Sequence, residues 1–414
     1  MLQTSPAPAS IESRRSWTVA FVTLGILAFS FGAPWLTTVA LQPIAEEAGG
    51  VRAVPALAGA LAWFGSGFGG IAMGYVAERI GVRWTVSGGA LMIACGLMLS
   101  SAGPGWPLYV GHGLFIGLLG LAGINAPLYV YVSRWFDHRR GSALALISSG
   151  IYVAGAVWPP FFERAISLYG WRDSMMAYGI IEVLVIVPLA FVFLAKAPER
   201  TDPSLKVGTV PMRRAVLGWP PNLVFAMLMA AIFMCCVPMA MPQQHIVAFC
   251  GDLGISAAHG ALMLSVLLGS AFVFRQVWGR ISDRIGGLRT VMLGSVTQLV
   301  TISAFLIVQD EYGLFTASAI FGLGFSGLIP ATILVVREMF PAREAAWRIP
   351  LLLLCSGSGM ATGGWLAGYI YDYFGYYAPA FAAGLAVNAA HATLIGILVM
   401  RRRMTIGGAS PRAA

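Results

Sequence analysis

Charged residues are scarce in this sequence. Only 10% of its 414 residues are charged and 58% are hydrophobic, whereas a soluble domain carries roughly 25% charged residues. This shortage excludes an ordinary soluble protein. The apolar runs are about 20 residues long or longer, which suits membrane-spanning helices and excludes the shorter strands of a barrel. The lipid bilayer is therefore the first partner that the sequence predicts.

Cysteine is also scarce, and motifs for catalysis are missing. The five cysteines lie in or beside apolar runs without metal-ligand spacing, so they are interpreted as small apolar residues. The sequence has no nucleotide-binding loop and no nucleophile–base pair, which argues against an enzyme and against direct drive by ATP. A net charge of +9 would suggest nucleic acid for a soluble protein, but here the charges flank apolar runs. No metal, cofactor or nucleic-acid partner is expected.

Twelve apolar segments predict an all-α membrane protein with twelve transmembrane helices. Their approximate spans are 17–41, 54–77, 84–102, 107–133, 141–163, 173–195, 219–248, 256–280, 289–308, 312–337, 347–371 and 377–400. The longest polar stretch separates the first six from the last six. The expected organisation is a tail (1–16), a six-helix bundle (17–195), a linker (196–218), a second six-helix bundle (219–400) and a second tail (401–414).

Lys and Arg residues are distributed unevenly between the loops. If both termini are cytoplasmic, 22 of the 26 lie on the cytoplasmic side and only Arg52, Arg164 and Arg172 lie on the outer side. Because cytoplasmic loops of membrane proteins are enriched in Lys and Arg, both termini are expected in the cytoplasm. The remaining one, Arg275, lies inside an apolar segment.

Three short sequences recur at offsets of 204 or 205 residues. "GYVAERIGVR" (74–83) returns as "GRISDRIGGLR" (279–289), "RWFDHRRG" (134–141) returns loosely as "EMFPAREA" (338–345), and "LYGWR" (168–172) returns as "YFGYY" (373–377). A repeat at one offset predicts two homologous six-helix halves.

The G-x-x-x-[DE]-R-x-G loop that occurs in both halves resembles the signature loop of the major facilitator superfamily. With twelve segments and a central linker, the resemblance covers essentially the whole chain. It implies two pseudo-symmetric six-helix bundles, a substrate cavity between them that opens alternately to each side, and a monomer.

The signature loops are expected to act as conformational switches. Gly74 and Gly279 would allow close helix packing, while Glu78 and Asp283 would pair with arginines or cap a helix. The alternative is that these charges only anchor the helix ends at the membrane surface. The predicted switch residues are Gly74, Glu78, Arg79, Gly81, Arg83, Gly279, Asp283, Arg284, Gly286 and Arg289.

Arg275 interrupts the segment 256–280, and a charge in the hydrocarbon costs about 3 kcal/mol or more. It lies roughly 7–8 Å from Arg280 along a helix axis, so its side chain could snorkel to the surface. However, Arg275, Gly279 and Asp283 share one helix face, and a packing role for Gly279 would turn that face towards protein. We therefore expect Arg275 to point into the bundle or cavity, where a carboxylate would suit its planar guanidinium.

A narrower resemblance supports this expectation. "HIVAFCGDLGIS" (245–256), the glycine four residues after Arg275, and "SRWFDHRRGSALAL" (133–146) resemble the monocarboxylate porters and the oxalate/formate antiporters. In those relatives the matching arginine binds the substrate carboxylate, which implies transport of small organic anions by symport or antiport. The chain departs from the proton-coupled carriers at Trp35, where they have lysine, and at Leu264, where they have aspartate. The coupling partner, a proton or a counter-anion, stays open.

Other residues are candidates for the cavity because the superfamily lines it with the corresponding helices. Each is also compatible with helix packing alone. Glu182, the acid within segment 173–195, is either paired or protonated at a helix interface, or it is a proton site. The alternative function is export of drugs or other hydrophobic compounds, and the expected location is the inner membrane of a bacterium. The predicted substrate-binding residues are Arg275, Trp35, Asn125, Tyr129, Tyr152, Gln243, His245 and Ser356.

Overall fold

The computed structural model describes residues 12–195 and 215–407. Within these ranges the chain is almost entirely helical and contains no strand beyond a single β-bridge between Val216 and Trp219. This confirms the predicted all-helical class. Most of the predicted linker and both chain ends lie outside the described residues.

The first half of the chain forms nine α-helices and one π-helical stretch. They are α1 (Arg14–Ser30), α2 (Gly32–Val39), α3 (Leu41–Glu47), α4 (Ala53–Ile80), α5 (Val82–Ser100), α6 (Trp106–Val110), η1 (Gly111–Leu121), α7 (Ala122–Ser133), α8 (Arg140–Ser148) and α9 (Gly150–Phe193).

The second half forms seven helices. They are α10 (Pro221–Asp252), α11 (Ala257–Ile285), α12 (Gly287–Ile307), α13 (Glu311–Phe325), α14 (Leu328–Met339), α15 (Ala342–Phe374) and α16 (Ala378–Gly407). Several extend beyond the predicted apolar segments, because a hydrophobic window misses the polar turns that continue a helix outside the membrane core.

Ten helical stretches in the described ranges are long and apolar enough to cross a membrane, or eleven if the two parts of α4, bent by 54°, form one span. The stretch Arg140–Phe193 has 54 residues, which is about 80 Å at 1.5 Å per residue and more than two crossings. It turns at Gly170, whose φ of 82° and ψ of 164° are not helical. The predicted segments 141–163 and 173–195 therefore lie on either side of this turn.

Glycines related by 205 positions adopt similar positive φ angles in the two halves. The pairs are Gly49 and Gly254 (φ 78° and 76°), Gly81 and Gly286 (φ 92° and 83°), and Gly170 and Gly375 (φ 82° and 81°). Only glycine adopts positive φ without steric cost, so each pair marks a place where a helix must end in a sharp turn. The two halves thus share one backbone plan, and the first pair extends the repeat beyond the three recurring sequences.

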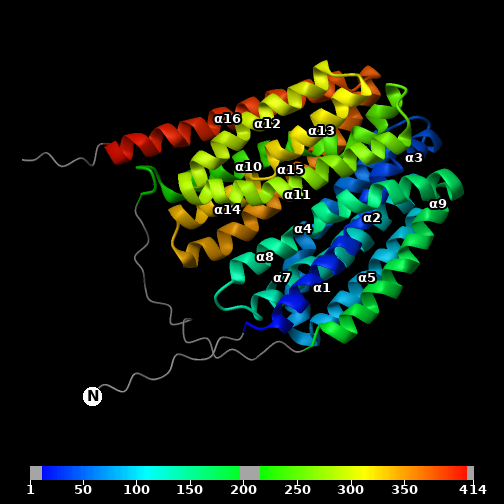
Figure 1. Cartoon of the computed structure of the whole chain (residues 1–414), viewed down its shortest axis with the longest axis horizontal. Helices are drawn as coiled ribbons and strands as arrows, with labels where there is room; N and C mark the ends of the chain where they lie inside the picture. The colour runs from blue at the N-terminus through cyan, green and yellow to red at the C-terminus, as the bar shows by residue number, and fades with distance from the viewer. Residues whose placement is uncertain (1–11, 196–214, 408–414) are drawn as a thin grey trace, which may run out of the picture.

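The two halves lie side by side, with α4 packed on α15 and α9 packed on α11. Following the predicted orientation, we name the end with Gly81 and Gly286 the inner end and the opposite end the outer end. In Figure 1 the halves approach each other at the right, near α3 and the turn of α9, and diverge towards α8 and α14 at the left.

Close helix packing within the first half depends on glycines of α4. A Cβ atom at Gly65 would lie 2.4 Å from the carbonyl oxygen of Gly113, and one at Gly69 would lie 2.3 Å from that of Leu118. Real side chains do not tolerate such distances, so α4 can approach η1 this closely only because both positions are glycine.

Candidate functional site

Arg275 reaches from α11 across to the first half of the chain. Its Nη2 donates a hydrogen bond to Ser148 Oγ at 3.2 Å, and its guanidinium carbon lies 5.3 Å from the centre of the Tyr152 ring. Tyr129 on α7 is close enough to interact electrostatically with Arg275. The side chain therefore crosses between the halves instead of snorkelling along α11 to the inner surface.

Arg275 has no acidic partner in the described ranges. The salt bridges found between residues 12–195 and 215–407 all involve other arginines or histidines. Ser148 accepts from Arg275 while its own hydroxyl donates to the carbonyl of Ala145 at 2.8 Å; it is a weak partner for a cation because the hydroxyl carries no charge. The guanidinium thus keeps the capacity to bind a stronger acceptor.

The expectation that Gly279 packs closely against another helix, from which the direction of Arg275 was inferred, is wrong. A Cβ atom at Gly279, or at its counterpart Gly74, would meet nothing within 4 Å, so neither glycine permits a close helix contact here. Both lie towards the inner end, where Gly279 is exposed and Gly74 lines a pocket between α4 and α7. The conclusion about Arg275 holds because the side chain is long enough to reach α8 from the same face.

The expected pairing of the signature-loop acids is present in one half only. Glu78 accepts a hydrogen bond from Arg134 at 3.2 Å, and Arg79 contacts Tyr75. Asp283 is exposed and has no partner in the described part of the chain. What the two loops have in common is instead the positive φ of Gly81 and Gly286.

In the second half another acid, Glu338 on α14, makes the contacts that were expected of Asp283. It accepts hydrogen bonds from the backbone N–H of Gly287 at 2.8 Å and from Arg402 at 3.1 Å, so it caps the start of α12. Glu338 occupies the position of Arg134 in the repeat, and the loose match between "RWFDHRRG" and "EMFPAREA" is the sequence signal that could have drawn attention to it.

Tyr152 and Trp35 are buried beside the interface between the halves. The Tyr152 ring centre lies 6.3 Å from that of Phe325 on α13, so Tyr152 touches both halves. Trp35 Nε1 donates to the carbonyl of Ile151 at 3.3 Å. The indole N–H that the sequence suggested for a ligand is therefore already used within the first half.

The three candidates Asn125, Gln243 and Ser356 differ in whether their hydrogen-bonding groups are free for a substrate. Asn125 is half-buried and has no hydrogen-bond partner in the described ranges, and the buried Nε2 of Gln243 also lacks one there. Ser356 Oγ lies 3.2 Å from Cys236 Sγ and links α15 to α10. Free hydrogen-bonding capacity thus remains on the two amides.

His245 does not offer a nitrogen to a ligand in this structure. Its Nε2 lies 2.7 Å from the carbonyl oxygen of Gly364, which can only accept, so Nε2 donates. Its Nδ1 then accepts from the Tyr377 hydroxyl at 2.9 Å. With the side chain completely buried, His245 ties α10 to α15 and to the turn after it.

Glu182 is completely buried, and both of its carboxyl oxygens lack a hydrogen-bond partner in the described residues. The nearby Tyr178 hydroxyl donates to the carbonyl of Phe29 at 2.6 Å instead. Within these residues Glu182 is therefore not paired at the helix interface. Because an unpaired buried carboxylate costs far more than a neutral acid, the contacts fit a protonated interface residue, and the role of Glu182 as a proton site stays a prediction.

A buried histidine in the π-helical stretch was missed by sequence reasoning. His112 Nε2 lies 2.6 Å from Thr37 Oγ1, and Nδ1 lies 3.0 Å from the carbonyl of Leu108 and from Ser100 Oγ. These contacts tie together α2, α5 and η1. Hydrophobic periodicity could not indicate them, because a π-turn shifts the register of the side chains. Across the described ranges no cluster of three or more His, Cys, Asp or Glu could hold a metal.

Comparison with known proteins agrees with this architecture. The family model described as Major Facilitator Superfamily matches residues 20–249 and 223–414. The rat protein named Monocarboxylate transporter 13 is 26% identical over 370 residues, covering 88% of this chain and 83% of its own. The Agnestins efflux protein AgnL12 of Paecilomyces divaricatus is 23% identical over 259 residues, covering 60% and 57%.

A solved structure of the peptide transporter POT in complex with sulfate has the same fold. It superposes with a TM-score of 0.70 over 93% of this chain and 95% of its own, at 15% sequence identity. The family model extends over both halves of the chain, and the helices repeat on one backbone plan. The chain therefore belongs to the Major Facilitator Superfamily: it is a multi-pass membrane transporter and not an enzyme.

Proposed function

We propose that this transporter carries small organic anions, with monocarboxylates as the substrate class, and that Arg275 binds the carboxylate. The observation that carries the proposal is a guanidinium that crosses between the two halves without a carboxylate partner in the described ranges. A cation in this position is stabilised by an anion, and one arginine balances one negative charge. The name of the rat relative supports the same substrate class.

The surroundings of Arg275 suit a carboxylate that also has an apolar part. A carboxylate can replace the Ser148 hydroxyl, because it adds the attraction of opposite charges and can accept two parallel hydrogen bonds from the guanidinium. The Tyr152 ring contributes a cation–π contact to Arg275 and an apolar face for the substrate. Asn125 and Gln243 have unused hydrogen-bonding groups for further polar atoms of the substrate.

The energy for transport would come from a gradient, since the sequence has no nucleotide-binding loop. The coupled species is a proton in symport or a counter-anion in antiport, and Glu182 is the proposed proton site. We propose a monomer in the inner membrane of a bacterium, with both termini in the cytoplasm, as the distribution of Lys and Arg indicates.

The test is the thermal stability of the purified protein in the presence of mono- and dicarboxylates. Wild type, Arg275→Gln and Arg280→Gln are compared, since Arg280 is an exposed arginine of the same helix. A ligand at 100 times its Kd stabilises the folded state by about 2.7 kcal/mol. We expect one or more monocarboxylates to raise the Tm of wild type and Arg280→Gln, and none to raise the Tm of Arg275→Gln. An Arg275→Gln variant that responds like wild type would refute the proposed role.

Export of hydrophobic compounds is the second candidate, because one relative is named an efflux protein. Glu182 would then be the acid that exchanges protons for the exported compound. Stabilisation by hydrophobic cations that is lost in Glu182→Gln, together with no response to any carboxylate, would favour this function over anion transport.

A further inference from the structure

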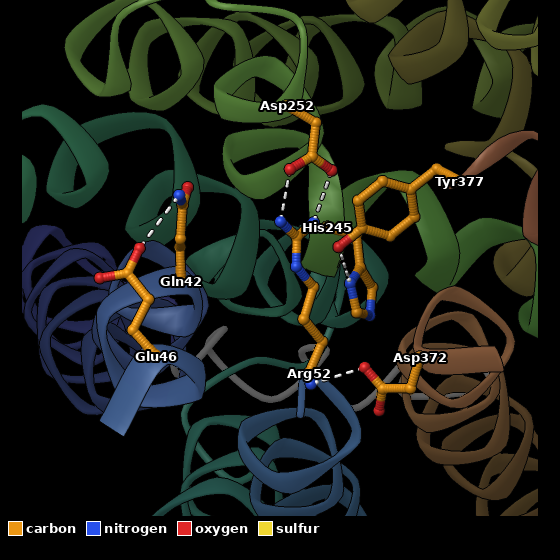
Figure 2. Close-up of polar contacts among 7 residues, drawn as sticks. All are labelled: Gln42, Glu46, Arg52, His245, Asp252, Asp372 and Tyr377. Atoms are coloured by element: carbon orange, nitrogen blue, oxygen red, sulfur yellow. Dashed lines mark hydrogen bonds and ion pairs between the residues drawn. The ribbon is translucent and has the colours of Figure 1, made fainter. Parts of the chain in front are cut away.

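Arg52, at the outer end of the first half, is bound to the second half (Figure 2). Its guanidinium makes two hydrogen bonds to the carboxylate of Asp252, the last residue of α10. Nη1 lies 2.7 Å from Oδ2, and Nη2 lies 2.5 Å from Oδ1. The Arg52 side chain is only 7% exposed and that of Asp252 28%. A bidentate, largely desolvated ion pair of this kind is among the strongest polar contacts that side chains form.

A second carboxylate of the same half binds the backbone at this residue. Asp372 on α15 accepts hydrogen bonds from the N–H groups of Arg52 and Ala53, both at 2.8 Å. The start of α4 has no side-chain cap from its own segment. Asp372 therefore supplies from the other half the negative charge that a helix N-terminus favours.

Aromatic side chains of the second half enclose the Arg52 guanidinium. Its central carbon lies 3.7 Å from the centre of the Tyr371 ring and 5.2 Å from that of Tyr377, and Tyr377 is held by His245. Burial is the largest single influence on the pKa of Arg52 and would lower it. The hydrogen bonds to Asp252, the interactions with Tyr377 and the charge of Asp252 together outweigh burial, so the pKa is raised. The arginine thus stays charged in a site that is built for it.

This contact differs from the other salt bridges in what it connects. The pairs Glu47–Arg172, Glu78–Arg134, Glu344–Arg348 and Glu338–Arg402 each join two residues of the same half. Arg52 and Asp252 join the two halves, across 200 positions of sequence. At the opposite end, Gly74 and Gly279 have no neighbours that a Cβ would meet.

We propose that Arg52, Asp252 and Asp372 form a latch that closes the outer end of the transporter. The latch holds the halves together in the present state and must break for the outer end to open. Its strength then sets the balance between the outer-closed and the outer-open state. The proposal needs only the alternating opening of the fold and does not depend on the identity of the substrate.

The experiment is hydrogen–deuterium exchange of the purified full chain, read in outer peptides (about 48–57 and 248–256) and in inner peptides (about 74–84 and 279–289). Arg52→Gln is compared with wild type and with Arg172→Gln, whose partner Glu47, at 2.6 Å, belongs to its own half. We expect Arg52→Gln to exchange at least several-fold faster in the outer peptides and slower in the inner ones. Arg172→Gln should leave the inner peptides unchanged.

A reversed pair separates the latch from a local effect on folding. The single variant Arg52→Asp places two acids together and should favour the outer-open state more strongly than Arg52→Gln. Combining it with Asp252→Arg should restore the exchange pattern towards wild type. If Arg52→Gln does not fold, Asp252→Asn breaks the same side-chain contact and keeps the cap from Asp372.

Two results would overturn the proposal. One is unchanged exchange in the outer peptides of Arg52→Gln or Asp252→Asn. The other is faster outer exchange without slower inner exchange, which would mean that the contact stabilises the outer loops locally. Neither result depends on the carboxylate measurements, so the latch and the substrate class can fail separately.

Discussion

At the scale of single residues, the polar groups of this transporter separate into those already engaged and those still free. Trp35 and His245 use their N–H groups and ring nitrogens on backbone and side-chain partners of their own half. Arg275 and Glu182 lack a counter-ion in the described ranges. A ligand or a proton is more readily accommodated by the second group, because no ion pair has to be broken.

Glu182→Gln is the substitution that tests the proton site. The amide has the shape of the protonated acid, so the variant should fold with a change in stability of about 1 kcal/mol or less, near the usual effect of a single substitution. Uptake driven by a proton gradient in proteoliposomes should be lost, while exchange of substrate across the membrane without a gradient continues. Uptake that still follows the proton gradient in this variant would remove Glu182 from the coupling.

Glu47, at the outer end, is expected to stabilise the folded protein by an amount that depends on pH. Its hydrogen bond from Arg172, assisted by one from Trp171 at 2.9 Å, holds the pKa of Glu47 below its ordinary value of 4.5. A carboxyl whose pKa is lower in the folded state stabilises the fold above its unfolded pKa. That contribution is lost as the pH falls through the folded pKa.

We therefore expect the Tm of Glu47→Gln to lie below that of wild type at pH 7, and the difference to shrink as the pH falls below 4.5. The measurement is a thermal melt at several pH values, with Glu46→Gln as the control because Glu46 contacts only Gln42 among the residues of Figure 2. A Tm difference that is constant with pH would contradict the assignment.

At the scale of elements, the glycines of the signature loops have two different roles. Gly81 and Gly286 end their helices at φ of 92° and 83°, where any other residue is strained. Gly74 and Gly279 lie inside helices with free space beside them. At such positions glycine destabilises a helix relative to alanine by roughly 0.5–1 kcal/mol.

Alanine at these four positions should consequently have opposite effects on stability. Gly81→Ala and Gly286→Ala are each expected to lower the free energy of unfolding by about 1–3 kcal/mol, whereas Gly74→Ala and Gly279→Ala should leave it unchanged or raise it slightly. The measurement is the melting temperature of each of the four variants, compared with wild type in one detergent. Equal destabilisation at all four positions would mean that Gly74 and Gly279 pack closely in the state that dominates in solution.

At the scale of the whole molecule, the repeat places equivalent turns at equivalent positions, but the contacts between the halves do not follow it. The Arg52 latch joins the outer ends without a symmetry-related copy in the described contacts, since position 257, 205 residues further on, is Ala257. Unequal contacts at the two ends are what a transporter needs if one end is to be closed while the other is open.

The amino-acid sequence by itself determined the class of fold, the helical segments and the duplication. These properties depend on local hydrophobicity and on the backbone cost of each residue, which neighbours in sequence already specify. It also singled out Arg275, because a charge within an apolar run is costly wherever the run packs.

The tertiary structure alone decided which polar groups meet. Arg52 contacts Asp252 and Asp372 across 200 and 320 positions of sequence, and nothing in the local pattern around Arg52 distinguishes it from the other predicted outer arginines. Whether a nitrogen or carboxyl is engaged, free or part of a latch depends on how distant helices pack against each other. That packing exists only in the folded molecule.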